Sequence, residues 1–106
     1  MAEGRALTAL GAWVEERTAR APAALRQRVL EHVAVTRSTG NAPADLARAA
    51  HRSLAGVLSA PGDRTVALDL LAADGLITLA LLRQAEDDPS SLVAFARSLT
   101  ELPAPA

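Results

Sequence analysis

The stretch VALDLLAADGLITLALL, residues 66–82, is almost continuously apolar but carries two aspartates, Asp69 and Asp74. It falls short of the roughly 20 apolar residues that a bilayer-spanning helix needs, and the two charges interrupt it. A helix that is apolar nearly all round is typical of the centre of a helical bundle or of an oligomer interface. The stretch therefore predicts the central helix of a soluble helical protein.

The composition also indicates an all-α fold. Of 106 residues, 50% are hydrophobic, mostly Ala and Leu, whereas aromatic residues make up only 2%. Good helix formers dominate, and the β-branched and aromatic residues that favour strands are sparse. We expect a compact bundle of about five helices in a single domain, residues 1–102, followed by a frayed Pro/Ala tail at 103–106.

Prolines mark the expected beginnings of the helices. Pro22, Pro43, Pro61 and Pro89 each lie where a helix-patterned segment starts, and proline fits the first turn of a helix. Gly40 is expected to close the second helix as a left-handed C-cap. The pattern predicts helices over 3–19, 22–38, 43–59, 62–86 and 89–102, with the fourth in the centre of the bundle.

The two aspartates of the fourth helix lie about 140° apart on a helical wheel, so they cannot form a paired-carboxylate site within the helix. Asp69 shares its side with Arg83 and several alanines, which predicts a solvated carboxylate. Asp74 lies among leucines, which predicts a buried polar contact with Thr78 and a facing helix. A functional carboxylate, and a turn at Asp74–Gly75 that splits the helix, are the alternatives.

Familiar catalytic patterns are missing from the sequence. It has no Cys for a thiol nucleophile and no Lys for a phosphate-binding loop, and it lacks the HExxH and GxSxG motifs. We therefore expect a protein that is not an enzyme and needs no cofactor. His32, His51 and Asp74 are weak metal-ligand candidates by residue type, but no ligand pair at helical spacing supports a metal site.

Nucleic-acid binding is an alternative function. The chain has a formal charge of −1, but residues 1–52 hold eight Arg against five acids, and residues 53–106 hold three Arg against seven. The second and third predicted helices have helix-turn-helix proportions. In that arrangement Arg48, Arg52 and His51 would face a groove, and Arg26 and Arg28 would contact phosphates. The basic excess is modest for a DNA-binding domain, so nucleic acid is the lesser expectation.

The favoured hypothesis is a non-enzymatic protein–protein interaction or oligomerisation module, acting as a homodimer or as an accessory subunit of another protein. The expected oligomer interface lies on the fourth helix, at Leu68, Leu71, Leu79 and Leu82. A bundle that encloses a small apolar ligand or a metal is a further alternative. Because the N-terminus lacks a basic start followed by a long apolar segment, we expect a cytoplasmic protein without a membrane partner.

Overall fold

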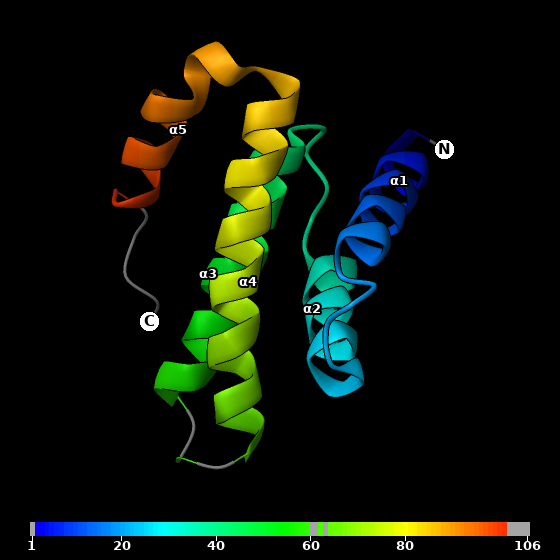
Figure 1. Ribbon diagram of the computed structural model, residues 1–106, viewed down its shortest axis with the longest axis vertical. Coiled ribbons are helices and arrows are strands. Elements are labelled where there is room, and N and C mark those ends of the chain that lie inside the picture. The colour runs from blue at the N-terminus through cyan, green and yellow to red at the C-terminus, as the bar shows by residue number, and fades with distance from the viewer. Residues whose placement is uncertain (1, 60–61, 63, 102–106) are drawn as a thin grey trace.

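The computed structural model describes residues 2–59, 62 and 64–101, with side chains from Ala9 onward. Its helices are α1 (Ala2–Arg17), α2 (Ala23–Val35), α3 (Ala42–Ser59), α4 (Arg64–Asp87), the short 3-10 helix η1 (Pro89–Ser91) and α5 (Leu92–Leu99) (Figure 1). The described residues contain no strand, which confirms the predicted all-α bundle. Pro61 and the predicted tail at 103–106 lie outside the described residues.

The chain is arranged around α4. The helices α3 and α4 form a long antiparallel hairpin, α1 and α2 lie on one side of it, and α5 folds back along the opposite side of α4 (Figure 1). α4 packs against α2, α3 and α5, which confirms its predicted central position. It is one continuous helix, so the Asp74–Gly75 dipeptide does not split it into two.

The connection between α2 and α3 differs from the prediction. α2 ends at Val35, because Thr36 adopts an extended backbone and its hydroxyl donates to the carbonyl of His32 at 2.7 Å. Gly40 has a positive φ of 85°, as a left-handed cap requires, but it lies just before α3 instead of closing α2. There the side chain of Asn41 accepts a backbone hydrogen bond from the first turn of α3 at 3.3 Å. The prediction of Gly40 as the C-cap of α2 is therefore wrong.

The start of the last helical segment is built on Asp88. Its carboxylate accepts hydrogen bonds from the hydroxyls of Ser90 and Ser91, each at 2.6 Å. Pro89 opens η1, where its missing N–H is not needed. The segment thus begins where the sequence predicted, although its first turn is a 3-10 helix.

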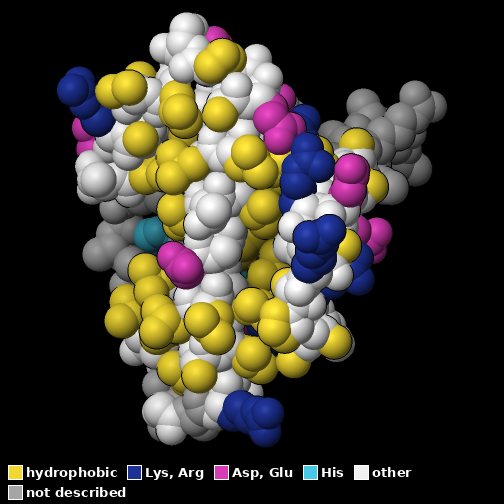
Figure 2. Space-filling view, viewed as in Figure 1, with side chains coloured by type: hydrophobic (Ala, Val, Ile, Leu, Met, Phe, Trp, Pro, Cys, Tyr) yellow, Lys and Arg dark blue, Asp and Glu magenta, His cyan; other side chains and the backbone are white. Residues whose placement is uncertain are grey.

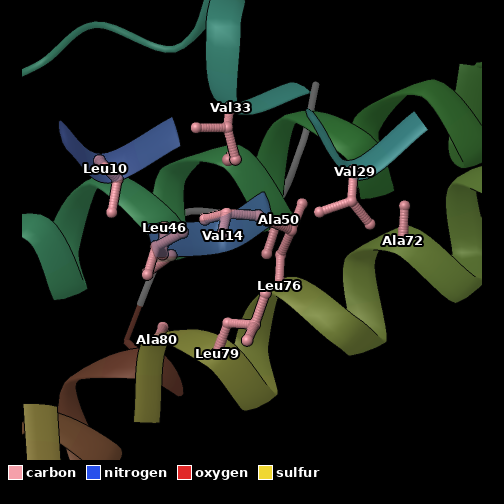
Figure 3. Close-up of a cluster of buried hydrophobic side chains, with 12 residues drawn as sticks. Leu10, Val14, Val29, Val33, Leu46, Ala50, Ala72, Leu76, Leu79 and Ala80 are labelled. Carbon is pink, nitrogen blue, oxygen red and sulfur yellow. The ribbon is translucent and has the colours of Figure 1, made fainter. Parts of the chain in front are cut away.

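The core is built from small and medium side chains of four helices (Figure 3). Its largest fully buried apolar side chains are those of Leu46, Leu76 and Val14. The two aromatic residues, Trp13 and Phe95, pack at its margin and are only partly buried. Many of the remaining buried residues are alanines, whose small side chains let helices approach closely. The buried residues of this apolar cluster are Leu10, Val14, Val29, Val33, Leu46, Ala47, Ala49, Ala50, Ala72, Leu76, Leu79 and Ala80.

Among the residues described, α4 alone is long and apolar enough to cross a membrane, judged by length and composition. The core helix of a soluble protein meets the same criterion. Only 33% of its most hydrophobic 18-residue window is buried within the chain, however. Much of the apolar surface of α4 therefore lies on the outside of the bundle.

Candidate functional site

α4 turns its small residues inward and several leucines outward. The exposed fractions are 54% for both Leu70 and Leu71 and 40% for Leu82. The side that carries Asp69 and the alanines, which the helical wheel predicted to be solvated, therefore faces the core. The residues of α4 that are buried are Asp69, Ala72, Ala73, Leu76, Leu79 and Ala80.

A cluster of polar groups surrounds the buried carboxylate of Asp69. Arg28 of α2 donates to both carboxylate oxygens, from Nε to Oδ1 at 2.6 Å and from a terminal guanidinium nitrogen to Oδ2 at 3.1 Å. His32, one turn further along α2, places Nε2 2.9 Å from Oδ1. Because a carboxylate can only accept, the imidazole nitrogen is the donor in this bond. Asp69 thus joins α4 to α2 through three hydrogen bonds.

α3 closes the cluster from the other side. The hydroxyl of Ser53, which is fully buried, donates to the backbone carbonyl of Asp69 at 2.6 Å. Gly56 lies so close that a Cβ atom at this position would be 3.3 Å from Oδ2 of Asp69. Three helices therefore converge on one side chain, whose residue is only 5% exposed.

Electrostatics keep this carboxylate ionised. The hydrogen bond from Arg28 lowers the pKa of Asp69; burial opposes this shift, and the bond from His32 adds to it. The same hydrogen bond raises the pKa of Arg28 above its ordinary value. Asp69 is consequently ionised at neutral pH, and its carboxylate acts as a hydrogen-bond acceptor only. Such a group is suited to holding helices together and has no proton to give to a substrate.

The predictions for the two aspartates are both wrong, and in opposite directions. Asp69, expected to be solvated, is buried, and Asp74, expected to be buried, is exposed. Thr78 is exposed as well, and its hydroxyl donates to the backbone carbonyl of Asp74 at 3.0 Å without touching the carboxylate. The reason is the close approach of α3 and α4 along their alanines, which draws the alanine-lined side of α4, with Asp69, into the core.

The three weak metal candidates do not converge. His32 bonds Asp69 inside the cluster, His51 is half-buried on α3, and Asp74 lies on the exposed side of α4. Within the described ranges no group of three His, Asp or Glu side chains has a geometry that would hold a metal ion.

Most of the basic residues considered for nucleic-acid contact are engaged within the chain. Arg28 is bound to Asp69, and Arg48 pairs with Asp45 and donates to Thr39 at 3.1 Å. Arg26 donates to the backbone carbonyl of Glu15 at 3.1 Å. On α3, Arg52 is exposed and His51 is half-buried. An extended connection, residues 36–41, also separates α2 from α3 in place of the expected short turn.

Trp13 forms a second polar contact between distant helices, for which the sequence carries no local signal. Its indole Nε1 donates to Glu86 of α4 at 3.2 Å, and Arg17 donates to the same carboxylate at 3.1 Å. The guanidinium carbons of Arg17 and Arg83 lie 5.2 and 5.3 Å from the centre of the Trp13 ring, within cation–π range. The single Trp in the chain thus fastens α1 to the C-terminal part of α4.

The outward side of α4, which we call the α4 outer face, carries several exposed leucines. In Figure 2, where α4 lies in front, hydrophobic side chains gather along this helix and beside it. Leu71 and Leu82 of the predicted interface belong to it. Leu68 is half-buried, and Leu79 is buried in the core, so its assignment to an interface is wrong. The exposed members of the face are Arg64, Ala67, Leu70, Leu71, Asp74, Thr78 and Leu82.

A surface depression of about 540 Å³ lies beside the connection between α1 and α2. Its walls include Arg26, Gln27 and Glu31 together with several alanines, and it is open to solvent. Pockets for small apolar ligands are enclosed and lined mainly by larger hydrophobic side chains. This depression lacks both properties.

Comparisons of the chain with protein-family models, curated proteins and solved structures found no match.

Proposed function

We propose that the protein is a non-enzymatic interaction module that associates with a second copy of itself through the α4 outer face. The observation that carries this proposal is the exposure of Leu70, Leu71 and Leu82 along one side of a single helix. Fully burying a leucine side chain contributes about 1.5–3 kcal/mol, and each of these leucines retains about half of its surface for a partner to cover.

The composition of the core supports self-association. Its largest fully buried apolar side chains are two leucines and a valine, and its two aromatic residues are only partly buried. Such a core buries little apolar area for each residue, and small domains of this kind have little stability to spare. A second copy that covers the α4 outer face would bury the apolar side chains that the single chain leaves exposed there.

The polar groups support a role in contact instead of catalysis. Asp69 is hydrogen-bonded to Arg28 and His32, and Glu86 is bound to Trp13 and Arg17. These carboxylates are held in place by groups of their own chain. They serve to fix the positions of α1 and α2 against α4 and so to shape the face that a partner would meet.

Light scattering coupled to size-exclusion chromatography tests the proposal. The wild-type chain is expected to form a dimer at micromolar concentration, and Leu71→Asp is expected to shift it to monomer while keeping its helical circular dichroism. Val35→Asp is the matched control, because Val35 is 58% exposed but lies on α2. A wild type that stays monomeric, or that sediments with lipid vesicles without dimerising, would contradict the proposal.

A further inference from the structure

Two opposite charges flank the most apolar part of the α4 outer face. Arg64 and Asp74 lie ten positions apart on the same helix, with Ala67, Leu70 and Leu71 between them. A rise of 1.5 Å per residue separates the two by about 15 Å, too far for an ion pair within one chain. Neither side chain forms a hydrogen bond or an ion pair with any other residue that the structure describes.

The position of Arg64 is unfavourable for its own helix. It occupies the first residue of α4, and no acidic residue is present in that first turn. The N-terminal end of a helix carries a partial positive charge, so an acidic side chain is favoured there and a basic one is not. Asp74 is equally isolated, since its neighbours on the outer face are apolar apart from Thr78. Among the residues that the structure describes, neither charge therefore has a stabilising contact.

We infer that a second copy supplies these contacts by packing its α4 antiparallel to the first, with the two-fold axis at the level of position 69. This inference rests on the proposed self-association and specifies its register. In that register Arg64 lies opposite the partner's Asp74, and the two-fold axis repeats the pair, giving two intermolecular ion pairs. The two pairs lie at either end of the shared apolar region, which contains Ala67, Leu70 and Leu71, whereas Leu82 lies beyond the N-terminal end of the partner's α4.

The same register matches the sizes of the apolar side chains. It places Ala67 opposite the partner's Leu71, so that a small residue faces a large one on each side of the axis. Alternating small and large residues across a helix–helix contact allows the side chains to interdigitate without voids. Leu70 lies opposite the partner's Leu68 in this register, so the charges are its main support and the Ala67–Leu71 contact adds to them.

Other arrangements of the two helices bring like charges together. A parallel pair in register places Arg64 against Arg64 and Asp74 against Asp74. An antiparallel pair centred on position 74 brings the two Asp74 carboxylates together in an apolar setting. Like-charge contacts of this kind disfavour an interface strongly, so the charges select against these alternatives.

Reversing the charges in separate chains tests the register. Arg64→Asp and Asp74→Arg, each alone, place two like-charged pairs in the dimer and are expected to raise its dissociation constant at least about tenfold. An equimolar mixture of the two variants restores both pairs with opposite charges. Native mass spectrometry is therefore expected to find the heterodimer in excess over both homodimers. Arg52→Asp, on α3, is the matched control for arginine reversal and leaves dimerisation unchanged.

Disulfide trapping gives an independent measurement, because the chain contains no cysteine. Arg64→Cys mixed with Asp74→Cys is expected to form a disulfide-linked heterodimer. Each variant alone is not, since its two cysteines would lie about 15 Å apart, beyond disulfide reach. A wild-type dimer unaffected by charge reversal, with no trapping in the mixture, overturns this register but leaves self-association standing. A monomeric wild type overturns both.

Discussion

The guanidinium of Arg28 and the carboxylate of Asp69, 41 positions apart in the chain, form a two-point ion pair with distances of 2.6 and 3.1 Å. Asp69 is buried, whereas the side chain of Arg28 is 33% exposed. The pair therefore sits at the edge of the core, where it fixes α2 against α4. With the contacts of His32 and Ser53, it joins α2, α3 and α4 at one point.

Asp69→Asn is expected to lower the free energy of unfolding by about 2–3 kcal/mol. Removing one member of a buried ion pair leaves its partner uncompensated, although part of the cost is recovered because Arg28 can reach water. Urea unfolding followed by circular dichroism measures the change. Asp87→Asn is the control on the same helix, because its carboxylate forms an exposed pair with Arg83, and it should cost less than about 0.5 kcal/mol. Equal losses in the two variants would contradict a structural role for Asp69.

Stability is expected to fall in acid through Asp69. Its pKa in the folded protein lies below that of an unfolded aspartate, which is about 4. The stabilisation is therefore complete above about pH 4 and is lost as the pH falls through the folded-state pKa. Urea unfolding at a series of pH values should show a smaller acid loss for Asp69→Asn than for the wild type. A residual loss is expected from Glu86 and Asp88, whose pKa values are also lowered.

Gly56→Ala is expected to destabilise the protein even though Gly56 lies within a helix. Its added Cβ would lie 3.3 Å from Oδ2 of Asp69, and Arg28 holds that carboxylate in place. Gly11→Ala in α1 is the matched control, because a Cβ there would meet nothing within 4 Å. The control should gain about 0.5–1 kcal/mol from helix propensity. Thermal unfolding of both variants is the measurement, and a gain for Gly56→Ala would show that Asp69 can move.

Glu86→Ala is expected to shift the fluorescence emission of Trp13 to longer wavelength. The substitution removes the acceptor of the indole N–H and the partner of Arg17, so the ring should become more exposed to water. The signal is unambiguous because Trp13 is the only tryptophan in the chain. Glu15→Ala, on the same helix as Trp13, is the control. An unchanged spectrum in Glu86→Ala would show that apolar packing alone positions the ring.

The helical architecture could be predicted because it depends on local properties. Alanine and leucine favour helices wherever they occur, and proline restricts the backbone of its own residue and of the one before it. The sequence therefore predicted the number of helices, their order and the central place of residues 66–82. Helix ends were less predictable. α2 ends at Val35, where the hydroxyl of Thr36 donates to the carbonyl of His32. The sequence does not specify this end, because the same hydrogen bond is possible in other backbone conformations.

The sequence by itself determined an alanine- and leucine-rich helical bundle whose fourth helix carries apolar residues on nearly every side. It could not determine which side of that helix faces inward, because a helix apolar all round has no dominant hydrophobic direction. The tertiary structure decided this through the close approach of α3 along Ser53 and Gly56 and the reach of Arg28 from α2. Those contacts depend on side chains distant in the chain. They buried Asp69 and left Asp74 on the surface.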